Sequence, residues 1–291
     1  MRIGIPRAIH YFYWPGLWER FFESLGFEVT VSPATSEHTV RRAALISEPE
    51  HCLPVKLLDA HIEFLIDKVD YVFVPRLLSH LKHHVSCTKL APMPDALRLR
   101  LNGRPQLLTV EINEEHKPLL DSLVEVGFTL TRDPKRCVRV AREALAASTP
   151  PTPVHTAPTP NIASGDFVLL AHPYLMGDDF FAGPIVRKLR EMSLPISLAE
   201  LPRDPAPSFV HWETSNRMYE FLRRLQPGEY AGIVHLSSFN CGCDSMCIEF
   251  FRELAQTRRI PYLVLMLDEH FATGGLETRL EAFVDSIRWR K

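Results

Sequence analysis

The sequence lacks the short motifs by which common nucleotide-dependent enzymes and serine hydrolases are recognised. It contains no Gly-x4-Gly-Lys-Ser/Thr loop, no Gly-x-Gly-x2-Gly after its first apolar segment and no Gly-x-Ser-x-Gly turn. Self-contained ATP hydrolysis, dinucleotide-dependent redox chemistry and serine hydrolysis are therefore all disfavoured.

The chain also has little net charge and no long apolar run. Its 33 basic and 35 acidic residues give a net charge of −2, so nothing indicates a nucleic-acid or anionic-membrane partner. No apolar run approaches the ~20 residues that a membrane-spanning helix needs. The opening residues, Arg2–Arg7, lack the apolar core of a signal peptide. We therefore expect a cytoplasmic protein without a nucleic-acid or membrane partner.

The six cysteines are few but unevenly placed. In a reducing compartment, cysteines serve as metal ligands or catalytic thiols more often than as disulfides. Three of them crowd into one short stretch, and two more lie in separate loop-like segments of the first half. In chain order these five are Cys52, Cys87, Cys241, Cys243 and Cys247. The sixth, Cys137, is expected to be a partly buried residue of a helix.

Apolar periodicity predicts an α/β fold. Residues 2–5 and 27–31 have the composition of strands, and a helical pattern over 12–25 separates them. This order is typical of a parallel sheet, and the second half of the chain repeats it. We expect two Rossmann-like lobes with mostly parallel sheets facing each other across a cleft. Further strands are expected at 71–74, 107–110, 167–170, 195–199, 230–236 and 261–266, and further helices at 40–46, 55–66, 114–126, 134–147, 185–192, 217–225, 248–259 and 276–288.

A proline-rich segment divides the chain almost in half. Residues 148–160 contain five prolines among small polar residues, a composition that cannot build a core. We place an N-terminal α/β lobe with Cys52 and Cys87 at 1–147, a linker at 148–165 and a C-terminal α/β lobe at 166–291.

The stretch Cys241–Cys247 is the strongest functional signal. It lies between an expected strand and an expected helix, so we predict a strand-to-helix turn in which Gly242 takes an unusual backbone angle. Unpaired N–H groups at the head of a helix favour an anion, and thiolate-bound metal clusters are anionic. We predict a metal site whose ligands come from Cys52, Cys87, Cys241, Cys243 and Cys247.

Other polar residues follow the expected strands, at the sheet edge where α/β proteins bind ligands. Lys56 and Arg76 could hold a negative cluster or substrate, or be ordinary surface charges. His172 follows one strand of the second half, and Asp268–His270 follow the last, where they could relay protons or cap a helix.

Zinc is the alternative metal. His51, His80, His83 and His84 lie close in sequence to two of the cysteines, and mixed Cys/His sets suit zinc. No Cys-x2-Cys pair is present, however, and the ligands would have to come from three distant loops. Two further readings stay open: a zinc-binding or cluster-carrying structural or assembly protein without catalysis, and a small-molecule binding module with incidental cysteines.

Several motifs resemble those of a known family. They are Arg2–Ala8, Glu50–Lys56, Val74–Arg76, Cys87–Leu90 with Pro94-Asp95, His172–Tyr174, Phe239–Gly242, Asp268–His270 and Gly275–Phe283. Together they resemble the 2-hydroxyacyl-CoA dehydratase-related (2-hydroxyglutaryl-CoA dehydratase D-component-like) proteins, in the branch found fused to or beside acyl-CoA dehydratase activases.

The resemblance implies an iron–sulfur protein of anaerobic metabolism. Relatives hold a [4Fe-4S] cluster with three cysteines, which correspond here to Cys52, Cys87 and Cys241. The sequence departs from the family pattern at Cys243, where proline is expected, and at Cys247. Either thiol could be a fourth ligand, which would favour electron transfer over dehydration, or the extra thiols could support a larger cluster.

The resemblance also implies a partner, an ATP-dependent activase or another iron–sulfur electron donor. It leaves open whether the chain is an enzyme and, if so, whether it is a lyase or an oxidoreductase of the dehydratase/reductase kind. Catalytic residues and substrate are not indicated, and a homodimer is one candidate assembly.

Overall fold

The computed structural model describes residues 1–148, 166–270 and 273–289. Contacts divide the chain into two compact units. Unit 1 contains Met1–Ala34, residues 57–148 and His211–Glu213; unit 2 contains Thr35–Lys56, residues 166–210 and residues 214–289. The lobe boundaries drawn from the linker stay a prediction, whereas the contacts group Cys52 with unit 2. Of the predicted linker, all but Ser148 lies outside the described residues.

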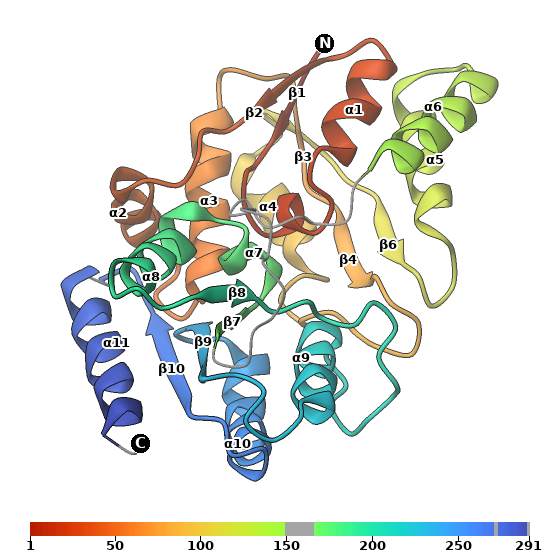
Figure 1. Ribbon diagram of the computed structural model, residues 1–291. Coiled ribbons are helices and arrows are strands. Elements are labelled where there is room, and N and C mark those ends of the chain that lie inside the picture. The colour runs from red at the N-terminus through yellow and green to blue at the C-terminus, as the bar shows by residue number, and fades with distance from the viewer. Residues whose placement is uncertain (149–165, 271–272, 290–291) are drawn as a thin grey trace. The chain divides into compact units, whose positions relative to one another are not determined.

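Unit 1 is built on a parallel sheet of four short strands, in the order β2-β1-β3-β5 (Figure 1). The interior strand β1 pairs with β2 on one side and with β3 on the other. Its apolar residues Ile3 and Ile5 are buried, which explains why so short a segment forms a strand. The strands are β1 (Arg2–Ile5), β2 (Glu28–Val31), β3 (Tyr71–Phe73) and β5 (Gln106–Leu108).

Aromatic rings fill the space between this sheet and its first helix. The rings of Trp18 and Phe22 lie 4.5 Å and 5.1 Å from that of Phe73, measured between centroids. Figure 1 shows α1, α5 and α6 side by side, and Cys137 of α6 is buried there as expected. The helices are η1 (Ile9–Phe12), α1 (Leu17–Ser24), α3 (Leu53–Leu65), α4 (Met93–Leu101), α5 (Leu119–Leu130) and α6 (Pro134–Ala147).

A second, two-stranded parallel sheet in unit 1 was not expected from the sequence. It pairs β4 (Arg76–Ser79) with β6 (Glu111–Asn113), and the register shifts between Leu77 and Ser79. Both strands follow strands of the larger sheet almost directly, and their short mixed sequences carry no alternating pattern. The sheet positions the loop that leads from Ser79 to Cys87.

Unit 2 has its own parallel sheet, in the order β10-β9-β7-β8. The two interior strands, β7 and β9, are buried over their whole length. Strands with both faces covered are continuous apolar runs, which is why the sequence pattern located them well. The strands are β7 (Phe167–Ala171), β8 (Ile196–Leu198), β9 (Gly232–Ser238) and β10 (Tyr262–Leu267).

Helices cover the unit 2 sheet, with α8 packed against α11 and α10 packed against β9 and β10 (Figure 1). Lys188 of α8 is 2.5 Å from a carboxylate oxygen of Glu281 on α11, so an ion pair joins these two helices. The helices are α2 (Glu37–Ile46), α7 (Pro173–Met176), α8 (Asp179–Glu191), α9 (Glu213–Arg224), α10 (Gly242–Thr257) and α11 (Thr273–Arg288).

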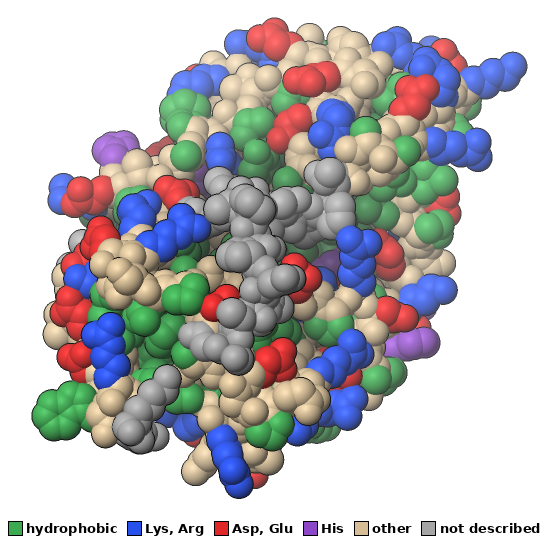
Figure 2. Space-filling model, in the orientation of Figure 1, with side chains coloured by type: hydrophobic (Ala, Val, Ile, Leu, Met, Phe, Trp, Pro, Cys, Tyr) green, Lys and Arg blue, Asp and Glu red, His purple; other side chains and the backbone are tan. Residues whose placement is uncertain are grey.

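Basic and acidic side chains of the described residues are interspersed over the face shown in Figure 2, in keeping with the small net charge. In the part of the chain that the structure describes, no helix combines the length and apolarity needed to cross a membrane.

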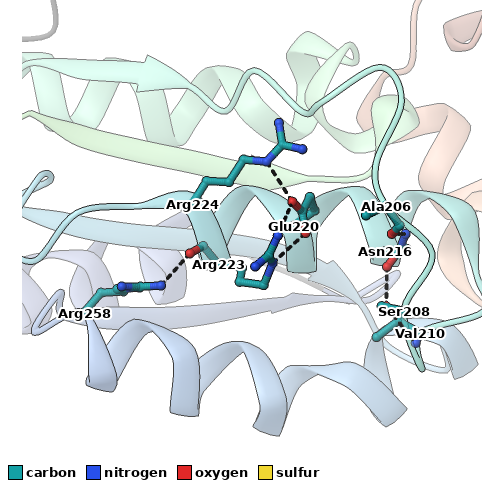
Figure 3. Close-up of polar contacts among 8 residues, drawn as sticks. All are labelled: Ala206, Ser208, Val210, Asn216, Glu220, Arg223, Arg224 and Arg258. Atoms are coloured by element: carbon teal, nitrogen blue, oxygen red, sulfur yellow. Dashed lines mark hydrogen bonds and ion pairs between the residues drawn. The ribbon is translucent and has the colours of Figure 1, made fainter.

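Polar contacts fasten α9 at both of its ends (Figure 3). The buried carboxylate of Glu220 accepts hydrogen bonds from Arg223 and Arg224, and these bonds lower its pKa to about 2. Near the other end, the amide of Asn216 donates to the carbonyl of Ala206 over 3.0 Å. Arg258 also donates to the carbonyl of Arg223 over 2.5 Å, so contacts with Ala206 and Arg258 attach both ends of α9 to other segments of unit 2.

The predicted fold class is confirmed: the protein is α/β, and its sheets are parallel. Several helices begin earlier than their apolar patterns indicate, and two of them, α8 and α10, begin six residues earlier. Helix α8 starts at Asp179 rather than 185, because the Asp178 carboxylate accepts a hydrogen bond from the N–H of Phe180 over 3.0 Å. Helix α10 starts at Gly242 rather than 248, with consequences for the cysteines.

Two buried histidines of unit 1 should make the protein unstable in acid. Burial lowers the pKa of His10 to about 3, helped by the charge of His80, and lowers that of His61 to about 4, helped by Arg7. Both rings titrate near 6.5 when unfolded, so the unfolded chain binds the extra protons. Their stabilisation is full above pH 6.5 and is lost as the pH falls toward 4, at about 1.4 kcal/mol per pKa unit.

Urea unfolding at a series of pH values, followed by tryptophan fluorescence, measures this effect. The free energy of unfolding should fall between pH 6.5 and 4.5, and should fall less in His61→Asn. An asparagine amide does not titrate and can still bond the hydroxyl of Ser32, which lies 2.9 Å from Nδ1 of His61. If the free energy of unfolding of this variant falls with pH as steeply as that of the wild type, His61 does not contribute to the acid sensitivity.

Candidate metal-binding site

Strand β9 carries three buried polar side chains toward its carboxyl end: His235, Ser237 and Ser238. Because β9 is an interior strand, these groups need partners inside the protein. The hydroxyl of Ser238 accepts a hydrogen bond from the N–H of Leu53 over 3.1 Å, and that of Ser237 donates to Asp244 over 2.5 Å. Polar groups thus concentrate at the sheet edge where α/β proteins bind ligands.

Cys241 is the N-cap residue of α10, which begins at Gly242. The chain bends sharply just before it, at Asn240, whose φ of 60° lies in the left-handed region that asparagine tolerates. The expectation that Gly242 supplies the unusual angle is therefore wrong, since Gly242 is helical. An asparagine makes the bend because its short polar side chain tolerates this conformation.

Cys243 and Cys247 consequently lie on the first turns of α10, not in an open turn as expected. Residues four apart on a helix share a face, and both side chains are buried. The physical reason for the early helix start is Asp244, whose carboxylate lies in the first turn and complements the N–H groups there.

The carboxylate of Asp244 is fully buried and has a partner for each oxygen. Oδ1 lies 2.9 Å from Nε2 of His172, and Oδ2 accepts the hydroxyl of Ser237. Nε2 of His235 stands 3.7 Å from Oδ2. Burial raises the pKa of Asp244, but the two histidines and the serine outweigh it and hold the pKa well below its usual range. Asp244 is therefore an anion inside the protein.

His172 is brought to Asp244 by its place between β7 and α7, as the N-cap residue of that short helix. Its ring stacks on Tyr174, with 5.0 Å between centroids and 10° between planes. Burial lowers the pKa of His172, but Asp244 and Cys241 together raise it well above the ordinary value. Its Nδ1 is buried and has no hydrogen-bond partner among the residues that the structure describes.

The Cys241 thiol is poised to be a thiolate. The thiol of Cys243 donates a hydrogen bond to it, and together with His172 this lowers the pKa of Cys241 to about 5 against the opposing effects of burial and Asp244. One donor atom each from His172, Cys241 and Asp244 lie within 4.8 Å of one another. A nitrogen, a sulfur and an oxygen so close together could hold a metal ion.

Cys247 differs from Cys241 in its protonation. Burial and the charge of Asp244 raise the pKa of its thiol to about 11, with a smaller opposing effect from Ser215. In the metal-free protein Cys247 is therefore a neutral thiol, and a metal would have to displace its proton.

Cys52 lies in unit 2 together with Cys241, directly before α3. The next residue, Leu53, donates its N–H to Ser238, and Ser238 ends β9 three residues before Cys241. The structure thus ties the Cys52 segment to the end of the strand that leads into the cysteine stretch. Cys52 itself is buried.

The two basic residues that could have held an anion are engaged elsewhere. Lys56 is buried and lies 2.5 Å from a carboxylate oxygen of Glu269, within unit 2. Arg76 donates to both oxygens of Asp95 at 2.7 Å and to the carbonyl of Ala91 at 2.7 Å. Glu269, in the segment Asp268–His270 that could have relayed protons, is therefore paired with Lys56.

Cys87 lies in unit 1, at the end of the loop that follows β4. Neighbouring segments anchor this loop: the N–H of Val85 donates to His211 over 3.1 Å, and that of Ser86 donates to Leu78 over 2.8 Å. The buried carboxylate of Glu213 pairs with the ring of His80 and accepts its backbone N–H over 3.3 Å.

The histidines considered as zinc ligands have other surroundings. His80 pairs with Glu213, His83 lies 3.6 Å from Glu115, and His84 Nδ1 lies 2.8 Å from the carbonyl of Lys82. Within the described residues, the group of three close donors found by geometry is His172, Cys241 and Asp244, and it contains none of these histidines.

Sequence reasoning placed His172 at the correct sheet edge but did not make it a site residue, and it missed Asp244 altogether. His172 directly follows a continuous apolar strand, a position that can be found from sequence. Asp244 looks like an ordinary residue of a helix start, and its burial depends on strands that lie elsewhere in the chain.

The fold and the site are those of an α/β protein with a buried group of cysteine, histidine and aspartate side chains. A family model described as CoA enzyme activase uncharacterised domain matches residues 2–201, more than half of the chain, and the chain belongs to this family. No match is found among curated proteins. The family agrees with the acyl-CoA dehydratase and activase association that the motifs indicated, whereas the D-component-like assignment stays a prediction.

Replacing Glu213 by alanine should destabilise unit 1. The change leaves the half-buried His80 ring and its backbone N–H without the buried carboxylate that they pair with, and breaking a buried pair from one side costs about 3 kcal/mol. Urea unfolding followed by tryptophan fluorescence is a suitable measurement, because Trp14 lies 5.8 Å from the His80 ring.

Glu115→Ala is the matched control. Glu115 pairs with His83 at the surface, and an exposed pair contributes no more than about 1 kcal/mol. If the free energy of unfolding falls by the same amount in the two variants, the buried pair stabilises unit 1 no more than the exposed pair does.

Proposed function

We propose that the protein binds an iron–sulfur cluster on cysteine thiolates and takes part in low-potential electron transfer for acyl-CoA dehydratase-type chemistry. An ATP-hydrolysing activase would be its partner, because the matching family model is described as a CoA enzyme activase uncharacterised domain. The observation that carries the proposal is the concentration of buried thiols at one edge of the unit 2 sheet: Cys241, Cys243 and Cys247 on α10, and Cys52 on a segment bonded to β9.

The side chains at this edge fit such a group. Iron–sulfur clusters are held by cysteine thiolates, and Cys241 is set up as a thiolate by Cys243 and His172. The head of α10 presents backbone N–H groups that favour negative charge. Burial of all four thiols limits the access of water, which stabilises a cluster against hydrolysis.

The ligands that we propose are Cys52 and Cys241, with Cys243 or Cys247 able to add a further thiolate. Cys87, which lies in unit 1, stays the prediction of the sequence for the third family-type ligand. The sulfur ligands of a cubane stand farther apart than the donors on a single ion, because iron and sulfide lie between them. The proposal therefore does not require the thiols to be in mutual contact.

When bound, the cluster would supply reversible one-electron redox chemistry. The residues of the chain would hold and tune it: thiolates bind iron, the first turn of α10 offsets negative charge, and Asp244 and His172 set the local electrostatics.

A second function is favoured by the close group of three donors. His172, Cys241 and Asp244 offer the nitrogen, sulfur and oxygen ligands that a zinc ion accepts. A protein that carries zinc there would be structural or would act in metal-centre assembly, without a redox change.

The metal content of protein purified without air distinguishes the two functions. We expect about four irons and four sulfides per chain, with a broad visible absorbance that dithionite bleaches. Cys241→Ala should lose nearly all of the iron, and Cys52→Ala should lose most of it.

Cys137→Ala is the control for a lost cysteine. Cys137 is buried on α6 in unit 1, where its sulfur lies close to Gly127 of α5, so this variant should keep its iron. Iron content that is unchanged in Cys241→Ala would defeat the proposed ligand set, and one colourless zinc per chain would favour the second function.

A further inference from the structure

His172 has one ring nitrogen that is bonded and one that is not. Nε2 lies 2.9 Å from Oδ1 of Asp244, whereas Nδ1 has no hydrogen-bond partner among the described residues. The residue is only 5% exposed, so water does not readily replace the missing partner. A buried polar atom without a partner costs about 1–3 kcal/mol, so its presence here calls for an explanation.

The pairing of His172 with Asp244 is the arrangement that proteins use to hold a metal-binding histidine. A ligating imidazole almost always donates its other N–H to a carboxylate or carbonyl, which orients the ring and raises its basicity. A metal bound at Nδ1 would displace the proton from that nitrogen, while Asp244 continues to accept the proton on Nε2. One ring nitrogen of His172 lies within 4.8 Å of both the Cys241 sulfur and a carboxylate oxygen of Asp244, so the imidazole stands beside Cys241.

Asp244 is better suited to orient the histidine than to bind metal itself. Its Oδ1 is used by His172, and its Oδ2 accepts the hydroxyl of Ser237 while His235 stands 3.7 Å away. A carboxylate whose oxygens both have hydrogen-bond partners keeps a fixed orientation, and its negative charge acts on the metal through the imidazole.

We propose that His172 is a metal ligand through Nδ1, beside Cys241, and that Asp244 is the residue that positions it. The inference rests on the proposed function for the identity of the metal, an iron of the cluster. It adds a nitrogen ligand to a site that the sequence described by cysteines alone, and it gives the unpaired Nδ1 a partner.

A nitrogen ligand has a consequence for the reduction potential. Imidazole is neutral and thiolate is negative, so a cluster with one histidine carries one negative charge less and is easier to reduce. Histidine ligation raises the potential of other iron–sulfur centres in the same way. The Asp244 hydrogen bond acts in the opposite direction, because it makes the imidazole more electron-rich. The two residues thus set the potential together.

Pulsed EPR of the reduced, anaerobically purified protein tests the ligand directly. A nitrogen bonded to iron gives a far larger hyperfine coupling than a peptide nitrogen near the cluster. We expect this strong coupling in the wild type and in His116→Ala, an exposed histidine of unit 1 that serves as the control. It should vanish in His172→Cys, which keeps its iron because a thiolate replaces the imidazole.

Redox titration of the same samples tests the positioning residue. The midpoint potential should fall in His172→Cys and rise in Asp244→Asn, which retains the strong nitrogen coupling. Asparagine keeps the shape of the side chain and an oxygen that can accept the N–H of His172, so the variant removes mainly the charge. A strong coupling that persists in His172→Cys, or equal potentials in all variants with full iron content, would overturn the inference.

Two further measurements separate this inference from the proposed function. Should His172→Cys fail to fold, His172→Asn provides the same test, since asparagine is an effective N-cap residue. Should the wild type contain no iron, the proposed function fails, and Co²⁺ added to the purified protein then reports on the site by its visible absorption. Co²⁺ bands that disappear in His172→Asn would support His172 as a ligand, and identical bands in both proteins would exclude it.

Discussion

A buried negative charge organises the functional end of unit 2. Asp244 has no access to water, and a carboxylate in such a place is tolerated only when hydrogen bonds and positive charge surround it. His172 supplies the charge and Ser237 supplies a hydroxyl, and they come from two neighbouring interior strands or their ends. The position of β7 beside β9 is therefore coupled to the chemistry of the site, because separating these strands would take His172 away from the carboxylate and leave it with Ser237 alone.

The same charge raises the pKa of both Cys241 and Cys247, but other neighbours divide these thiols into two kinds. Cys241 at the head of α10 accepts hydrogen bonds from Cys243 and His172 and becomes a thiolate, whereas at Cys247, six residues further along, burial and Asp244 prevail and the thiol stays neutral. Three cysteines that look equivalent in the sequence thus differ in readiness to bind a metal. Because thiolates bind metal more readily than thiols do, Cys241 is better prepared than Cys247 for the ligand role that we propose.

Both units place a histidine directly after a strand and pair it with a carboxylate in the first turn of a helix. In unit 1 the pair is His80 after β4 with Glu213 of α9, and in unit 2 it is His172 after β7 with Asp244 of α10. The helix N-terminus stabilises the carboxylate in each case, and the carboxylate in turn holds the loop that carries the histidine. In unit 1 this histidine–carboxylate pair anchors the loop that leads to Cys87. In unit 2 it holds His172 beside Cys241.

Local patterns of apolar residues were sufficient to predict the α/β class, because each interior strand is a short continuous apolar run and each long helix has an apolar face. The clustering of three cysteines after the strand at 230–236 was also evident from the sequence, because it depends only on the order of the residues and not on how the chain folds. Only the tertiary structure decided that α10 starts at Gly242, that Cys52 belongs with unit 2, and that Asp244 pairs with His172. These features depend on which strands become neighbours, and burial by distant segments leaves no periodic signal near the residues that it affects.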